Sequence, residues 1–228
     1  ECCLVLVVRH SVFVLAPPVG LADVELPDAL TSDDICRAAS EVKAAWNVGP
    51  GPVASVVNLL EANGIVTLRL PDGTDPAVNA FSTNEGSRPL VFLSQGHDDK
   101  ARSRFDAAHE LGHLLLHPDT EPGSKVVENQ AHAFAAEFLM PCDEIIDQLP
   151  RRIDWPAFHD LKKYWGVSLK ALVFRAHTLD RLSDASYRRA NQQLSIWGVP
   201  EPGAFGRSES PQLLGMAKSL MTENGIDF

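Results

Sequence analysis

The sequence is poor in cysteine, and its four cysteines are not spaced for a shared role. Cys2 and Cys3 are adjacent, while Cys36 and Cys142 are each isolated. In a chain of 228 residues they do not amount to the disulfide framework that stabilises small secreted domains. The sequence has no C-x-x-C pair, which argues against a thiolate zinc site. Cysteine usage therefore favours a reducing compartment, and we expect the protein to be cytoplasmic.

Long apolar runs are also missing. The amino terminus comes nearest, with apolar runs at 2–8 and 12–16, but Arg9-His10-Ser11 separates them. Each run is too short to span a bilayer, which needs about 20 residues, and Glu1 is not the positive start of a secretory signal. We therefore expect no membrane segment. We interpret residues 1–30 as an unassigned segment with a β-strand or hairpin, or as a fragment left by an upstream boundary, since the chain does not begin with Met.

Positive charge is scarce over most of the chain. The sequence has 20 Lys and Arg against 30 Asp and Glu, a formal net charge of −10. This balance argues against a nucleic-acid surface over the whole chain. Residues 151–190 depart from it, with nine Lys or Arg and four Asp or Glu. We interpret that stretch as a solvated helical surface, with docking onto a partner or DNA as the alternative.

The strongest chemical signal is His109-Glu110-Leu111-Gly112-His113. Positions i and i+4 of a helix lie about 5–6 Å apart at Cβ, so two imidazoles there can bind one Zn²⁺ from the same side. Glu110 can then reach a water on that metal. Two ordinary helix histidines are the alternative, but burying them without partners is costly. A buried helix over 106–117, ended by Pro118, is predicted by apolar residues at 107, 108, 111, 114, 115 and 116.

A second helix is predicted over 126–140, because apolar residues recur there at 127, 131, 134, 135, 138 and 139. The link between the two helices is short, so the second should fold back beside the first. A catalytic zinc usually has three protein ligands and one open position for water. Glu128 lies where it could face the two histidines, and His132 follows one turn later on the same face. Either residue is a candidate for the third ligand.

These segments resemble the ImmA/IrrE family of metallo-endopeptidases. The similarity begins with residues 104–113 and 128–141. It continues in further segments that occur in the family's order, at 46–53, 60–65, 81–82 and 88–92. It covers residues from about 33 to 197, most of the chain.

The resemblance implies a zincin-like fold and a ligand set. Glu128 takes the position of the family's third zinc ligand, beside His109 and His113. Family members usually have Asn where this chain has His132, which leaves His132 as an alternative ligand or an accessory polar contact. We interpret Glu137 as structural, or as the partner of an imidazole. Mn²⁺ is an alternative to Zn²⁺, because two histidines and a carboxylate accept several divalent ions.

The chemistry expected of this set is hydrolysis of a peptide bond. A bound metal lowers the pKa of water from about 16 towards 7, and Glu110 is the expected general base. His132, Tyr164 and Tyr187 are candidates for the donor that stabilises the developing oxyanion.

The resemblance also implies a substrate, namely a helix-turn-helix transcriptional repressor cut to relieve repression. Relatives often carry an Xre-type helix-turn-helix domain, so we expect no direct DNA binding unless such a domain is missing upstream. One alternative is a non-enzymatic sensing domain of a transcription regulator with a structural metal site. Another is a protein-binding role for residues 151–190.

The fold class expected is α+β, with a small β-sheet packed on helices and a helical C-terminal region. We divide the chain into the N-terminal segment 1–30, a zincin-like metallopeptidase domain at 31–150 and a helical region at 151–228. Besides the two helices above, the pattern predicts helices over 31–46, 53–63, 154–165, 168–180, 183–197 and 211–224, and strands over 65–70, 76–82 and 90–94.

Overall fold

The computed structural model describes residues 4–8, 11–15, 27, 29–71, 74–75, 80–84, 88–94, 99–118, 123–203 and 206–225. The strands in this part of the chain are β1 (Leu4–Val8), β2 (Ser11–Leu15), β3 (Val66–Arg69), β4 (Ala80–Thr83) and β5 (Leu90–Leu93). The helices are α1 (Ser32–Ala45), α2 (Val56–Ala62), α3 (Lys100–Leu116), α4 (Lys125–Leu139), α5 (Cys142–Ile145), α6 (Trp155–Trp165), α7 (Leu169–Thr178), α8 (Asp184–Trp197) and α9 (Leu213–Glu223).

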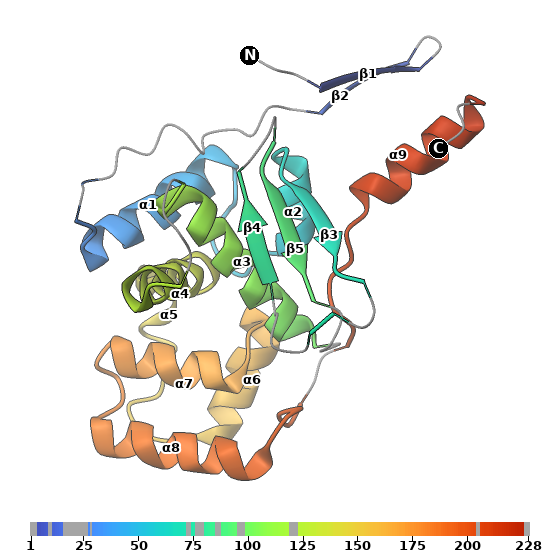
Figure 1. The fold of residues 1–228 in the computed structure, drawn as a ribbon. Coiled ribbons are helices and arrows are strands. Elements are labelled where there is room, and N and C mark those ends of the chain that lie inside the picture. Colours follow the sequence, from blue (N-terminus) through green and yellow to red (C-terminus); the bar gives the residue numbers. More distant parts are fainter. Residues whose placement is uncertain are drawn as a thin grey trace.

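A three-stranded sheet lies beside the helix of the His-Glu motif. Its strand order is β3-β5-β4, with β3 parallel and β4 antiparallel to β5, so β4 is an edge strand. Figure 1 shows α3 beside β4, with α4 and α1 beyond it and α6, α7 and α8 grouped below. The small sheet on helices and the helical C-terminal region match the predicted α+β architecture.

The predicted N-terminal hairpin is confirmed. Strands β1 and β2 pair antiparallel, with Leu4 opposite Leu15 and Val8 opposite Ser11. The remainder of segment 1–30, except residues 27, 29 and 30, lies outside the described residues. So do residues 76–79 of the strand predicted at 76–82.

Side-chain caps set most helix starts. Thr31 and Asp34 form a capping box that begins α1 at the predicted place. The start of α3 lies six residues before the predicted one, because Asp99 accepts a hydrogen bond from the backbone N–H of Ala101 at 2.8 Å. Conversely, α2 begins three residues late, because Ser55 is its cap and the carbonyls of the two preceding residues accept from a buried arginine.

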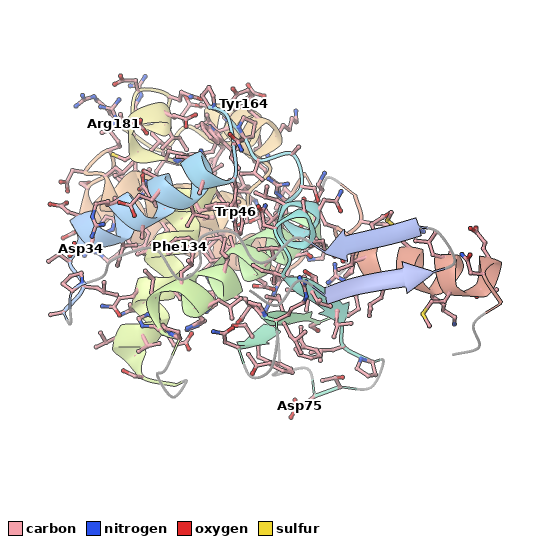
Figure 2. The ribbon with its side chains drawn as sticks, turned by 90° about the horizontal axis from the view of Figure 1, so that it is seen from above. Asp34, Trp46, Asp75, Phe134, Tyr164 and Arg181 are labelled. Carbon is pink, nitrogen blue, oxygen red and sulfur yellow. The ribbon has the colours of Figure 1, made fainter. Side chains whose placement is uncertain are left out.

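The interior is one apolar cluster that extends from α1 to α8. Phe138 lies at its centre, stacked on Phe134 and edge-on to Trp46 with ring centroids 5.8 and 6.4 Å away. Figure 2 shows Trp46 and Phe134 inside the molecule and Asp34, Asp75 and Arg181 at its periphery. No helix in the described ranges is both long and apolar enough to cross a membrane.

Three buried ion pairs involve the C-terminal region. Two connect it to the rest of the fold, and the third lies within it. Arg175 of α7 pairs with Glu137 of α4. Arg104 of α3 pairs with Glu209 at 2.6 Å, and Lys162 of α6 pairs with Glu201 at the same distance. Glu209 also accepts from the backbone N–H of Val57 and the hydroxyl of Ser55, at the start of α2. The segment before α9 is thus anchored on the helix that carries the His-Glu motif.

Candidate metal centre

Three potential ligands from two helices meet at one point. His109 and His113 of α3 bring their Nε2 atoms to 2.9 Å of each other. Glu128 of α4 places one carboxylate oxygen 3.3 Å from His109 Nε2 and the other 3.6 Å from His113 Nε2. A tetrahedral zinc with Zn–N of about 2.0–2.1 Å has ligand atoms about 3.3 Å apart. Among the described residues this is the one group of three or more His, Cys, Asp or Glu able to hold a metal.

The charge state of these residues fits a cation. Burial lowers the pKa of His109 to about 3, and the charges of His132 and His113 lower it further. Burial also lowers the pKa of His113, against the opposing charge of Glu128. Both rings are therefore neutral near pH 7, which is the form that ligates metals. Two neutral nitrogens and a carboxylate directed at one point are the donor set of a divalent metal.

Close packing of α3 on α4 brings the ligands together. A Cβ on Gly112 would lie 3.1 Å from the Phe134 ring and 3.2 Å from the Ala131 Cα, closer than nearly all real contacts. Glycine at this position lets the helices approach each other. This close approach holds the first half of α4 against α3.

Glu110 is buried beside this group, with 5% of its surface exposed. Its carboxylate accepts a hydrogen bond from the Ser82 hydroxyl at 2.7 Å. Burial raises the pKa of Glu110 to about 7; the Ser82 hydrogen bond opposes this rise, and the charges of Asp106 and Glu128 add to it. A carboxyl group with a pKa near neutrality is suited to taking and returning a proton. Ser82 was missed by the sequence analysis, which assigned 81–82 only to a strand region.

His132 lies next to the three-residue group but outside it. Its Nδ1 donates to the Glu128 carbonyl at 2.8 Å, and its ring centroid lies 4.4 Å from that of His109. Glu137 hydrogen-bonds no imidazole among the described residues, which corrects that part of its interpretation. Its partners are Arg175 and the backbone N–H of Cys142 at 2.9 Å, so its contacts are structural.

The group opens into a cleft of about 1590 Å³. Side chains of β4, α3 and α4 line one part, and side chains of α7 and α8 with the loop at 198–201 line the rest. Of the candidates for an oxyanion donor, His132 and Tyr187 line this cleft. Tyr164 does not; it lies on α6 with 56% of its surface exposed.

Three of the nine Lys and Arg side chains in residues 151–190 pair with acids elsewhere in the fold. Lys162, Arg175 and Arg181 pair with Glu201, Glu137 and Asp147, three acids outside that stretch. Only part of its charge therefore remains for a partner, which weakens the alternative of docking through a basic surface.

Comparison with known proteins identifies the family. The sequence model of the IrrE N-terminal-like domain, a peptidase family, matches residues 60–177. This match covers more than half of the chain and includes α3, α4 and all but the last residue of α7. No curated protein matches the chain significantly. The resemblance found in the sequence is confirmed: the chain belongs to the IrrE N-terminal-like domain family of peptidases.

Proposed function

We propose that the protein is a zinc-dependent endopeptidase that regulates transcription by cutting a helix-turn-helix repressor. One observation carries the enzymatic part: three donor atoms meet beside the buried Glu110 at the edge of a cleft large enough for a polypeptide segment. Membership of a peptidase family supports the peptidase activity in this proposal. The repressor is the substrate that the resemblance to ImmA/IrrE proteins implies.

In the proposed mechanism His109, His113 and Glu128 hold the metal. When bound, the metal supplies Lewis acidity that activates water and polarises the peptide carbonyl. Glu110 takes a proton from the attacking water and returns it to the leaving amine. The Ser82 hydroxyl holds the Glu110 carboxylate through its hydrogen bond at 2.7 Å. His132 and Tyr187 line the cleft and are the candidates to donate to the oxyanion.

The proposed ligand set predicts different effects for two neighbouring substitutions. Glu128→Ala should weaken zinc binding by at least about 100-fold, because even partners of the ligands can change metal affinity by 10- to 100-fold. His132→Ala should change it by only a few fold, because His132 lies outside the group of three side chains whose ligand atoms meet. Competition with a chelating dye measures both affinities. A larger loss for His132→Ala would make His132 the third ligand.

A non-enzymatic sensing domain with a structural metal is less well supported. Structural zinc sites generally have four protein ligands and are closed. In the part of the chain that the structure describes, three donor side chains meet, and all three line the cleft.

Incubation with a repressor tests the whole proposal. Metal-free protein is mixed with a purified helix-turn-helix repressor encoded beside its gene, with no metal, with Zn²⁺ or with Mn²⁺. The expected result is one pair of fragments, seen by intact mass, only after metal is added. An intact repressor with the metal-loaded protein would contradict the assigned substrate. If the metal-loaded protein cuts neither the repressor nor an unfolded protein, the non-enzymatic sensing domain is favoured.

A further inference from the structure

The cleft has a second wall, built by α7 and α8, of which the proposed mechanism uses only Tyr187. Its side chains include Ala171 and Phe174 from α7, and Tyr187 and Leu194 from α8. We propose that this wall, centred on Phe174, is an apolar subsite that selects a large apolar side chain about three or four residues from the cleaved bond. This inference rests on the proposed peptidase function and specifies its substrate.

Of the eight large apolar side chains that are exposed among the described residues, three line the cleft: Phe81, Phe174 and Val199. Phe174 has 42% of its surface exposed, although its neighbours Leu172 and Val173 are fully buried. Phe81 of β4 has 43% exposed, is stacked on Phe92 and lines the same cleft. Each ring therefore leaves more than two-fifths of its surface in water and forgoes part of the free energy that full burial would give. Rings exposed together in one concave site are typical of a binding surface.

The place of Phe174 relative to the length of α4 sets how many substrate residues separate the subsite from the cleaved bond. Glu128, His132 and Ala136 follow at steps of four residues and all line the cleft, so the cleft follows α4 for about 12 Å. The residue after Phe174, Arg175, is held at the far end of α4 by Glu137 and by the Met140 carbonyl at 3.1 Å. An extended peptide rises about 3.3 Å per residue. It therefore covers this length of α4, about 12 Å, in three or four residues, and we infer the same spacing for a side chain that contacts Phe174.

The wall is fixed in place before any substrate arrives. Ser168 caps α7 by accepting from the Ala171 N–H at 3.0 Å, and Glu201 accepts from the Leu169 N–H at 2.7 Å. With the buried Arg175–Glu137 pair, these contacts hold both ends of the helix. A preformed apolar wall favours binding of a matching side chain, because no free energy is spent on ordering the protein when the substrate binds.

Cleavage-site profiling tests the subsite. Zinc-loaded protein is incubated with a complex peptide mixture, and the cut sites are identified by mass spectrometry. We expect large apolar residues to be enriched at one fixed position, three or four residues from the cut. Phe174→Ala should lower the preference for Leu over Ala there by about 10-fold in kcat/KM. Phe174→Glu should shift the preference towards Lys and Arg. Tyr164→Ala, which removes an exposed aromatic ring outside the cleft, should leave the profile unchanged.

The outcomes separate the subsite from the peptidase function. Cutting without a positional apolar preference, or the same profile from Phe174→Ala as from the wild type, would overturn the subsite and leave the peptidase proposal standing. If the wild-type protein cuts nothing, the proposed function fails. Fluorescence anisotropy of a labelled Leu-containing peptide on the Glu110→Gln protein then decides. If the double variant with Phe174→Ala binds this peptide about 10-fold more weakly than Glu110→Gln alone, the subsite is supported. If the two proteins bind the peptide equally, the subsite is rejected.

Discussion

Replacing Glu110 with Gln is expected to lower the rate of peptide hydrolysis by about 10²- to 10⁴-fold, the usual contribution of a general base. The amide has nearly the shape of the carboxylate and its oxygen can still accept from Ser82, 2.7 Å away in the native site. It cannot take a proton from water, so the loss should be chemical. Initial rates and elemental analysis of the purified variant measure activity and bound metal separately.

Glu41→Gln is the matched control, because Glu41 lies exposed on α1 and pairs only with Arg37 among the described residues. It should retain the wild-type rate. Undiminished hydrolysis by Glu110→Gln would remove the proposed base. Loss of the metal together with activity would instead make Glu110 part of the ligand set.

Arg104→Met is expected to lower the free energy of unfolding by about 3–5 kcal/mol, the usual effect of removing one partner of a buried ion pair. Arg104 pairs with Glu209 at 2.6 Å and also donates to the carbonyls of Val53 and Ala54. Methionine keeps much of the volume but leaves the Glu209 charge buried without its cation. Urea unfolding followed by circular dichroism gives the difference.

A double-mutant cycle isolates the pair. Arg104→Met combined with Glu209→Gln should cost less than the sum of the single changes, because the variant no longer buries an unpaired carboxylate. Arg37→Met, which breaks an exposed pair with Asp34 and Glu41, should cost at most about 1 kcal/mol. Strict additivity of the two buried substitutions would show that the ion pair contributes nothing to stability.

Local signals in the sequence predicted most of the helices and the proximity of the candidate ligands. The apolar spacing of 106–117 and 126–140 predicted two adjacent helices, and Glu128 does lie beside His109 and His113. The helices predicted over 31–46 and 183–197 begin where expected, with Thr31 and Ser183 as their caps. These features depend on contacts within a few residues, or on one short connection between helices.

The remainder depends on contacts between distant parts of the chain. Ser82 reaches Glu110 across 28 residues, and no pattern around a serine in a strand indicates that contact. Arg104 meets Glu209 across 105 residues. The wall carrying Phe174 could not be foreseen for the same reason, because α7 is placed against α4 by the pairing of Arg175 with Glu137. Tertiary packing decides which side chains share a cleft, and periodicity carries no information about it.

The anchoring of Glu209 on Arg104 has a consequence for the order of synthesis. The His-Glu motif leaves the ribosome long before residue 209 does, so a nascent chain carries the Arg104 guanidinium without its partner. The surroundings of α2 and α3 are completed only when that late segment folds back onto them. Translation order thus delays completion of the surroundings of the candidate metal centre until residue 209 has been made.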